Sequence, residues 1–333
     1  MAMFKTALVT GGAGFIGAHL VALLVKEGVK VTVLDTAVKT KGLPKGIKGI
    51  KGSILDQDTL EKAIKGQECV FHLAALTHLW ARNKKDFAAV NVEGTRNVLE
   101  AAKKAKVKKI VVTSTETILR AWRDPNPFPI SENDPAPELD DMAGPYTRSK
   151  WRADRLVQKA AKGGLPVVSV YPAVPVGPGD YNLTAPTRMI LDFVTGKTPA
   201  YLNALLNYVP VGDVARGHYQ AAILGAPGGC YILGGENLAM AHFLERLEDV
   251  SGKKMPKRRV PFELAYSFAV LSEFFANMIT RKPPLASREG VRLAMNPSFV
   301  TSQLAADKLG YRPSGVKPAL KATVEWFQEE GLI

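Results

Sequence analysis

A glycine-rich loop at residues 11–17, Gly-Gly-Ala-Gly-Phe-Ile-Gly, constrains the fold of this chain more than any other stretch. It follows an apolar strand expected at Thr6–Thr10 and opens an expected helix, which is the context that a dinucleotide-binding loop requires. There Gly11 permits the tight turn, Gly14 lets a pyrophosphate approach the backbone, and Gly17 lets the helix pack close to the strand. Phosphates would lie at the helix N-terminus, where free N–H groups favour anions. The loop therefore predicts a dinucleotide-binding βαβ unit.

Short β-branched runs alternate with helical patterns through the first half of the chain. We expect strands at residues 6–10, 29–35, 47–51, 69–73, 109–114 and 166–171, and helices at residues 14–27, 60–65, 87–105 and 146–162. Such alternation implies parallel βαβ units, and near-continuous apolar strands imply a sheet covered on both faces. The expected fold is therefore α/β, a doubly wound parallel sheet of the Rossmann type.

After residue 171 the regularity falls, and helices mix with two short strands expected at residues 208–211 and 230–233. We predict a dinucleotide-binding Rossmann domain over residues 1–173. Residues 174–333 would form a smaller, mostly helical substrate-binding lobe, with some elements returning to the main sheet.

The net charge of +13 admits nucleic acid, an anionic membrane surface or anionic small molecules as partners. The lysine-rich stretches at residues 39–51 and 103–109 lack the interleaved aromatic side chains of a base-stacking surface, so we expect no nucleic-acid partner. A basic cluster at residues 253–259 precedes an apolar stretch at residues 261–279. That pair leaves two interpretations open, a peripheral membrane contact or a helix that packs within the lobe.

The two cysteines, Cys69 and Cys230, do not make a disulfide framework, so we expect a reducing, cytoplasmic compartment, with membrane association left open. We expect no signal peptide, because no apolar segment with a cleavage site precedes the first strand. A spanning helix is not expected either, since no uncharged apolar run reaches about 18 residues. No metal is expected, because no cluster of histidine, cysteine and carboxylate side chains has ligand spacing. His72, in an expected strand, is interpreted as a packed residue.

Asp35 ends the second expected strand, at the distance from the glycine loop where a carboxylate accepts hydrogen bonds from an adenosine ribose. A carboxylate there repels a 2′-phosphate, so we predict NAD as the cofactor. The alternative role for Asp35 is to cap a turn before Thr36. Lys39 and Lys41 follow closely and can tolerate a 2′-phosphate, so NADP stays open as well.

Tyr146 and Lys150 lie four residues apart at the start of an expected helix and therefore share a face. A nearby ammonium stabilises a phenolate and lowers its pKa, so Tyr146 can exchange a proton with a substrate oxygen while hydride moves to or from nicotinamide. The hydroxyl of Thr115, at the end of the preceding strand, is our candidate for orienting that oxygen, and Ser114 is the alternative.

The sequence resembles the extended short-chain dehydrogenase/reductase superfamily, with its NAD-dependent epimerase/dehydratase family, over essentially its whole length. The matching motifs are residues 10–17, Val70-Phe71-His72-Leu73-Ala74-Ala75, Asn91-Val92-Glu93-Gly94-Thr95, residues 113–115, the pair Tyr146 and Lys150, and Val176-Gly177-Pro178-Gly179-Asp180. The resemblance implies an enzyme that uses a nicotinamide dinucleotide. It also implies a homodimer that pairs through the helices at residues 87–105 and 146–162.

The resemblance places further residues at the cofactor. The strand end at Ala74 and Ala75 passes the cofactor, Asn91 supports its site, and Lys150 holds the nicotinamide ribose. The pair that flanks adenine, usually Asp-Ile or Asp-Leu, is here Ser53 and Ile54. The full set expected at the cofactor is Gly11, Gly14, Phe15, Ile16, Gly17, Asp35, Ser53, Ile54, Leu73, Ala74, Ala75, Asn91, Lys150, Tyr171, Pro172 and Val174.

The second half narrows the resemblance to the dihydroflavonol-reductase-like branch, which includes hopanoid-associated epimerase-like proteins and lies close to the 3β-hydroxysteroid dehydrogenases. The segments that carry it are Leu79-Trp80, Pro175-Val176-Gly177-Pro178, residues 189–193 and residues 231–237. Nucleotide-sugar enzymes usually carry an arginine and an asparagine before the V-x-G-P loop, and residues 170–174 here have neither. This favours an alcohol/ketone oxidoreductase acting on a lipophilic, sterol- or triterpenoid-like substrate. A nucleotide-sugar epimerase or dehydratase with retained NAD and a non-catalytic dinucleotide sensor are the alternatives.

Overall fold

A seven-stranded sheet, all of whose neighbouring strands run parallel, forms the centre of the computed structural model, which describes residues 4–37, 43–45, 47–124, 128–297 and 299–333. The strand order is β10-β6-β5-β4-β1-β2-β3. The strands are β1 (Thr6–Thr10), β2 (Lys30–Asp35), β3 (Lys48–Lys51), β4 (Cys69–His72), β5 (Lys109–Thr113), β6 (Val167–Pro172) and β10 (Cys230–Leu233). The chain moves outward from β1 to β3 and then returns to β4, so the order reverses between β1 and β4. Ligands of such sheets bind outside the carboxyl ends of the strands at this switch point.

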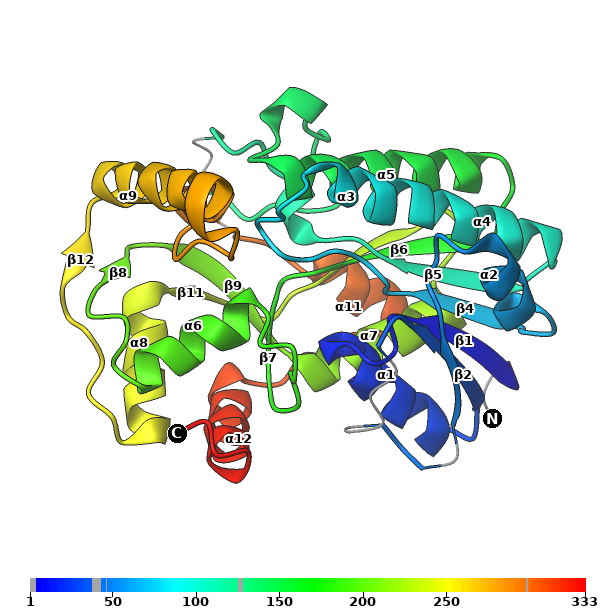
Figure 1. Ribbon diagram of the computed structural model, residues 1–333. Coiled ribbons are helices and arrows are strands. Elements are labelled where there is room, and N and C mark those ends of the chain that lie inside the picture. The colour runs from blue at the N-terminus through cyan, green and yellow to red at the C-terminus, as the bar shows by residue number, and fades with distance from the viewer. Residues whose placement is uncertain (1–3, 38–42, 46, 125–127, 298) are drawn as a thin grey trace.

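Helices cover both faces of this sheet (Figure 1). One face carries α1 (Phe15–Lys26), α7 (Val211–Leu224) and α11 (Gln303–Leu309), and the other carries α2 (Gln57–Ile64), α4 (Gly94–Lys104) and α5 (Pro145–Lys162). The pleat of the strands explains the two layers, since Ala7 and Val9 of β1 pack on the first face and Leu8 packs on the second. The predicted doubly wound α/β fold is confirmed.

The helix expected at residues 87–105 contains a π-helical turn. The short α3 (Lys85–Phe87) leads into the π-helix η1 (Ala88–Glu93), which continues into α4. Such wide turns are rare and occur frequently at functional sites. Asn91 lies inside this one and is buried.

A second layer of structure lies beyond the carboxyl ends of the sheet. A small sheet contains β7 (Val174–Val176), β9 (Leu205–Pro210) and β11 (Glu236–Ala239), and a strand pair contains β8 (Tyr201–Leu202) and β12 (Arg259–Val260). The helices α6 (Ala185–Val194), α8 (Met240–Ser251) and α12 (Val316–Glu329) enclose a separate apolar core against them. Both β10 and α7 belong to the main layer although they follow residue 173. The domain boundary at residue 173 itself stays a prediction.

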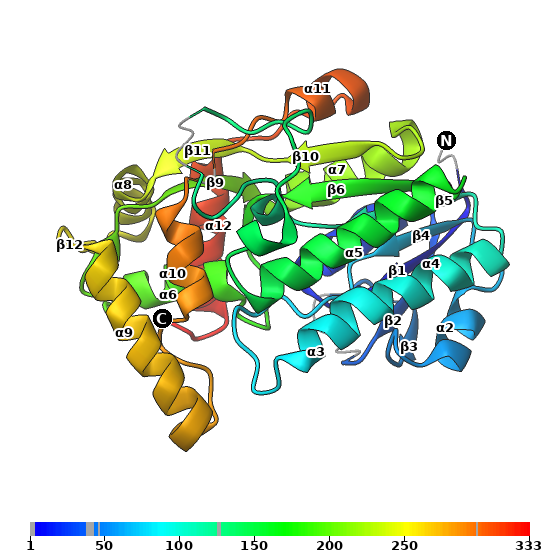
Figure 2. The same ribbon diagram turned by 90° about the horizontal axis from the view of Figure 1, so that it is seen from above.

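Helix α9 (Phe262–Phe275) runs along the outer edge of this lobe and continues into the π-helical turn η4 (Ala276–Thr280), before α10 (Arg288–Met295) returns toward α5. Figure 2 shows the end of this helix projecting beyond its neighbours. Two short 3-10 turns, η2 (Glu116–Ile118) and η3 (Leu139–Asp141), complete the elements. Among the described residues, no helix is both long enough and apolar enough to cross a bilayer.

Candidate active site

The glycine loop forms a cradle between β1 and α1. Gly11 has a φ of +70°, and a Cβ on it would lie 2.6 Å from the backbone nitrogen of Ala74. A Cβ on Gly17 would collide with the carbonyl oxygen of Gly11. Gly14 is the N-cap residue of α1, and its N–H donates to Gly11 over 3.1 Å. The turn tolerates no side chain at Gly11 or Gly17, and a Cβ on Gly14 would lie 3.2 Å from the carbonyl oxygen of Gly11, so the cradle fits a pyrophosphate at the helix N-terminus.

Asp35 ties the end of β2 to this cradle. Its carboxylate accepts hydrogen bonds from the N–H of Ala13 at 3.0 Å and from the N–H of Ala37 at 3.1 Å. The bond from Ala37 is the turn cap that the sequence analysis gave as the alternative role of Asp35, and the bond from Ala13 holds the glycine loop. Carboxylate oxygens each accept more than one bond, so both contacts leave capacity for ribose hydroxyls. Lys39 and Lys41 lie outside the described residues.

The remaining residues expected around the adenine end lie along the same edge of the sheet. Ser53 accepts the N–H of Leu55 at 3.1 Å, and Ile54 is buried against Gly94 of α4, where no side chain would fit. Residues Phe15 to Gly17 open α1, while the half-buried residues Leu73 to Ala75 follow β4, where the N–H of Leu73 donates to the carbonyl of Thr10 at 3.0 Å. Phe15 and Gly17 are the fully buried members of the first group, and Ile16 is half-buried.

Asn91 joins the π-helical turn to α5. Its side-chain oxygen accepts the N–H of Leu76 at 2.7 Å, and its nitrogen donates to the carbonyl of Leu76 at 3.0 Å and to Ser149 Oγ at 2.9 Å. Ser149 in turn donates to the carbonyl of Tyr146 at 2.7 Å. Asn91 thus fixes the segment after β4 relative to α5 and has no donor left for a ligand. Its contribution to a cofactor site is therefore indirect in this structure.

His72 is packed, in agreement with its interpretation from the sequence. Its ring nitrogens lie 2.8 Å from Thr10 Oγ1 and 3.0 Å from Thr95 Oγ1. Burial lowers the pKa of His72 to about 3, so the ring is neutral at physiological pH.

Tyr146, Lys150 and Thr115 come together where β5 ends and α5 begins. All three side chains are almost fully buried, and the tyrosine and threonine hydroxyls are hydrogen-bonded. Lys150 Nζ donates to the carbonyl of Thr113, the last residue of β5, at 2.7 Å. Ser114 Oγ is also buried, and it has no hydrogen-bond partner among the described residues. After the end of β5, therefore, the Thr115 hydroxyl is paired with the tyrosine and the Ser114 hydroxyl is unpaired.

Burial dominates the electrostatics of the pair. It raises the pKa of Tyr146, opposed by the hydrogen bond from Thr115, and it lowers the pKa of Lys150 to about 8, opposed by the charge of Asp154. We expected the ammonium to lower the pKa of Tyr146. Instead, Lys150 is engaged with Thr113 and does not offset the burial of the phenol. The phenol is thus a protonated hydrogen-bond donor at neutral pH, beside a lysine that titrates close to neutrality.

Glu289, which sequence reasoning did not single out, caps the N-terminus of α5. It comes from α10 in the C-terminal layer and is 2% exposed. Its carboxylate accepts the N–H of Tyr146 at 3.0 Å, the N–H of Thr147 at 2.8 Å and the hydroxyl of Thr147 at 2.9 Å. A carboxylate at a helix N-terminus satisfies free N–H groups and complements the helix dipole. No local pattern could have revealed it, because 143 residues separate Glu289 from Tyr146.

A cavity of about 200 Å³ lies beside this capped helix start, and we call it the α5–α10 cavity. Aromatic and charged side chains line it, among them Trp80, Lys84, Phe87, Arg148, Arg288 and Arg292. Phe87 also packs edge-on against the ring of Tyr146, with the ring centroids 6.5 Å apart. Arg288 pairs with Glu273 at 2.7 Å, and Arg292 donates to Ala143 and Tyr266. The remaining cations, Lys84 and Arg148, are exposed at its rim.

Tyr171 and Pro172 are buried at the end of β6, and Val174 starts β7. The Tyr171 hydroxyl donates to Asp154 of α5 at 2.7 Å and contacts Cys230, so its side chain is turned into the main layer. Only the backbone at this position is left to face a cofactor.

Cys230 is half-buried, and its sulfur also accepts a hydrogen bond from Gln158 at 3.1 Å.

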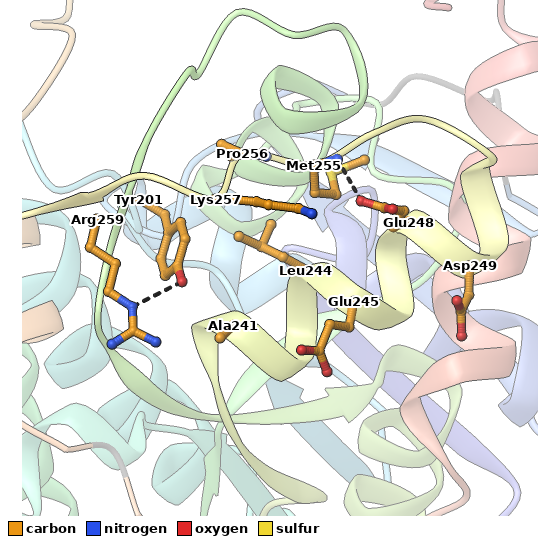
Figure 3. Close-up of a pocket in the computed structure, with 10 residues that line it drawn as sticks. All are labelled: Tyr201, Ala241, Leu244, Glu245, Glu248, Asp249, Met255, Pro256, Lys257 and Arg259. Atoms are coloured by element: carbon orange, nitrogen blue, oxygen red, sulfur yellow. Dashed lines mark hydrogen bonds between the residues drawn. The ribbon is translucent and has the colours of Figure 1, made fainter.

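A larger cavity, of about 400 Å³, lies away from these residues on the outer side of α8 (Figure 3). Glu245 and Glu248 of α8 line it together with Lys257 and Arg259, and Figure 3 shows Lys257 pointing toward Glu248. Asp249 also lines the cavity but pairs with Lys317 at 2.9 Å. Arg259 donates to the hydroxyl of Tyr201 at 3.1 Å, and Glu248 accepts the N–H of Met255 at 2.8 Å. Among the described residues, no group of histidine, cysteine and carboxylate side chains could hold a metal ion.

Comparison with known proteins shows which family shares this arrangement. The model of the NAD dependent epimerase/dehydratase family matches residues 7–234. A putative dihydroflavonol 4-reductase of Synechocystis is 34% identical, over 100% of this chain and 97% of its own length. Sterol demethylase protein B of Methylococcus capsulatus is 28% identical, over 98% of this chain and all of its own length.

Two solved structures share the fold over nearly their whole length. The crystal structure of gox2253 is 33% identical with a TM-score of 0.85, and covers 99% of each chain. The UDP-glucose 4-epimerase of Thermus thermophilus, solved with NAD, is 25% identical with a TM-score of 0.77, and the match covers 97% of this chain and 99% of the other.

Proposed function

Because this chain belongs to the NAD-dependent epimerase/dehydratase family, within the extended short-chain dehydrogenases/reductases, we propose that it is an oxidoreductase that interconverts a secondary alcohol and a ketone. The substrate in this proposal is lipophilic and resembles a sterol or triterpenoid. The cofactor is NAD, held by the residues placed above along the glycine cradle, Asp35 and the strand ends.

The observation that carries the proposal is the hydrogen-bonded Tyr146 and Thr115 with Lys150 one turn further along α5. When bound, the nicotinamide supplies or accepts a hydride. Tyr146 gives its proton to the substrate oxygen in reduction and takes it back in oxidation. Thr115 orients that oxygen by a hydrogen bond, and the unpaired Ser114 hydroxyl offers a second one. Lys150, charged below about pH 8, anchors the end of β5 through the carbonyl of Thr113 and would hold the nicotinamide ribose.

The lipophilic substrate class is supported from two sides. Residues 170–174 lack the arginine and asparagine of nucleotide-sugar enzymes, and Tyr171 is turned into the main layer instead. One relative is named for the reduction of dihydroflavonol and another for the demethylation of sterols. Dihydroflavonols and sterols both contain fused or linked rings.

The test is reduction of a panel of hydrophobic ketones by purified protein with NADH or NADPH. Tyr146→Phe removes only the hydroxyl, and we expect the rate to fall by about 10² to 10⁴. Tyr208→Phe is the matched control, because that tyrosine is also buried but its hydroxyl makes a 3.9 Å contact with the sulfur of Met240. Turnover that survives Tyr146→Phe unchanged would contradict the proposed acid–base role and favour a non-catalytic dinucleotide sensor.

A nucleotide-sugar epimerase is the second candidate, and one observation favours it. Arg148 and Lys84 are exposed at the rim of the α5–α10 cavity, where they could pair with a diphosphate. Such enzymes retain their cofactor. NAD that copurifies with the protein, together with turnover of a UDP-sugar and no oxidation of NADH by any ketone, would replace the first proposal with this one.

The proposal also includes a cytoplasmic location and a homodimer. Pairing through α4 and α5 would be polar, because none of the described residues on these helices is an exposed large hydrophobic side chain. Sedimentation velocity of the purified chain measures the dimer directly, and Arg152→Glu on the exposed face of α5 tests whether that face makes it.

A further inference from the structure

Helix α9 and its continuation η4 expose an apolar surface that no other element of the described structure covers. Only Ala269, Glu273 and Ala276 of this segment are buried. The exposed side chains include Leu264, Phe268, Leu271, Phe275 and Met278, with Leu271 at 59% and Met278 at 67% exposure. Their spacing of three and four residues places them in one stripe along the helix. A contiguous apolar surface of this kind marks a contact with another molecule or with a membrane.

Basic side chains surround the projecting end of this helix. Arg281 and Lys282 follow η4 directly and are exposed. The loop before α3 lies against the same end, because Trp80 Nε1 donates to Asn277 of η4 at 3.0 Å. That loop and the first residue of α3 bring in three more exposed cations, so the five residues that we call the basic collar are Arg82, Lys84, Lys85, Arg281 and Lys282.

The other end of the helix is basic as well. Arg258 and Arg259 precede it and are exposed, and Glu263 is the exposed carboxylate of its first turn. The charge pattern disfavours pairing of α9 with a second copy. An antiparallel pair would bring Arg258 and Arg259 opposite the basic collar, and a parallel pair would bring collar against collar. Like charges in contact oppose both arrangements.

An apolar stripe with cations at both ends is complementary to a lipid surface that carries negative charge. The end of α9 projects beyond the neighbouring elements in Figure 2, so this end of the helix is placed to meet such a surface. We propose that α9 and η4 dock this protein peripherally on anionic membranes, with the stripe inserted at the interface and the basic collar on the lipid headgroups.

Docking would also orient the catalytic layer. Lys84 of the collar and Glu273 of α9 both line the α5–α10 cavity. Glu273 pairs with Arg288, which adjoins the Glu289 that caps the catalytic helix. The membrane-facing helix is therefore connected to the start of α5 through two consecutive residues of α10. A substrate that partitions into lipid would meet this side of the molecule first.

Vesicle co-sedimentation of the full-length protein tests the proposal. We expect binding to vesicles of equal parts phosphatidylcholine and phosphatidylglycerol at low salt. Binding should be weaker at high salt and weaker still to phosphatidylcholine alone, because salt screens the headgroup attraction. Binding that is equal on both vesicle types, or absent from both, would overturn the proposal. The assay needs no turnover, so its failure leaves the proposed reaction untouched.

Two double variants, one on the stripe and one on other faces, separate docking from general surface effects. Leu271→Gln with Met278→Gln should weaken binding about a hundredfold. The control, Leu224→Gln with Leu55→Gln, changes exposed leucines on other faces, at 57% and 43% exposure, and should leave binding unchanged. Equal losses in both double variants would overturn the assignment to α9.

The collar is tested in the same way. Arg281→Gln with Lys282→Gln should weaken binding to the anionic vesicles about thirtyfold. Lys103→Gln with Lys159→Gln makes the same change of net charge on α4 and α5 and should have no such effect. Sedimentation velocity without vesicles completes the design. If the wild type does not bind vesicles but forms a dimer, and Leu271→Gln with Met278→Gln makes it monomeric, the occupant of the apolar stripe is a second copy of the chain instead.

Discussion

Replacing Glu289 tests whether the C-terminal layer positions Tyr146, the proposed acid–base residue. Its carboxylate is 2% exposed and accepts three hydrogen bonds at 2.8 to 3.0 Å from the first turn of α5. Glu289→Ala leaves these donors unsatisfied, at about 1–3 kcal/mol each, and opens a cavity. Because the neighbours relax in part, we expect a loss of about 3–5 kcal/mol. With about 2.1 cal/mol/K of unfolding entropy per residue, that lowers the Tm of a 333-residue chain by about 5 °C.

Glu289→Gln is the sharper variant, because it keeps the shape and one acceptor oxygen. Its amide group turns a donor toward a backbone N–H, so we expect a smaller loss of about 1–2 kcal/mol. The first turn of α5 should shift with it, and Tyr146 with the turn. We expect kcat to fall at least tenfold with a smaller change in KM, as a displacement of about 1 Å at a reacting group can cost 10²-fold.

The pH dependence gives an independent check. Burial raises the pKa of Glu289 above its usual value, so the folded protein binds the proton more tightly than the unfolded chain. Glu289 therefore adds stability that is complete below the ordinary glutamate pKa and is lost as pH rises through the raised pKa. Glu289→Gln should remove that slope from a plot of unfolding free energy against pH.

Thermal melts and steady-state kinetics of the wild type, Glu289→Gln and the exposed control Glu100→Gln measure all three effects. A variant that melts and turns over like the wild type would refute the capping role. A lower Tm with an unchanged kcat would show that the cap stabilises the fold without positioning Tyr146.

Three further outcomes are expected. Gly17→Ala should abolish NAD binding in a fluorescence titration, because its Cβ collides with the carbonyl of the preceding turn, whereas Gly212→Ala, which faces open space, should bind normally. Asp35→Asn should shift the ratio of kcat/KM for NADP over NAD upward about tenfold, with Asp58→Asn as the neutral control, and an unchanged ratio would contradict the ribose role. Burial lowers the pKa of Lys150 from 10.5 to about 8. The charged lysine therefore destabilises the fold at low pH, and the free energy of unfolding rises as pH increases from about 8 to 10.5. Lys150→Met should flatten the rise in unfolding free energy, about 3 kcal/mol at most, that the wild type shows across that range.

Much of the main layer could be predicted from the sequence because its signals are local. The apolar runs of β1 and β2 and the glycines between them specify strand, turn and helix within about thirty residues. Expected and observed bounds of α5 differ by one residue, since Pro145 takes the first helical position. The π-helical turn around Asn91 was not predicted, because its hydrogen bonds to Leu76 and Ser149 arise only after β4 and α5 have packed.

Only part of the candidate site could be predicted, for the same physical reason. The spacing of Tyr146 and Lys150 identified a shared helix face, but burial decides their pKa values, and burial is a property of the packed layers. Tyr171 was expected near the cofactor, yet its hydroxyl turns to Asp154, since β6 packs beneath α5.

Local pattern by itself thus determined the doubly wound sheet, the glycine cradle and the tyrosine–lysine pair at the start of α5. Tertiary structure alone decided that Glu289 caps that helix and that α9 leaves its apolar stripe uncovered. Both depend on how α9 and α10 fold back against elements more than a hundred residues earlier in the chain. Residue periodicity reports which side chains share a face, but it does not report what that face meets.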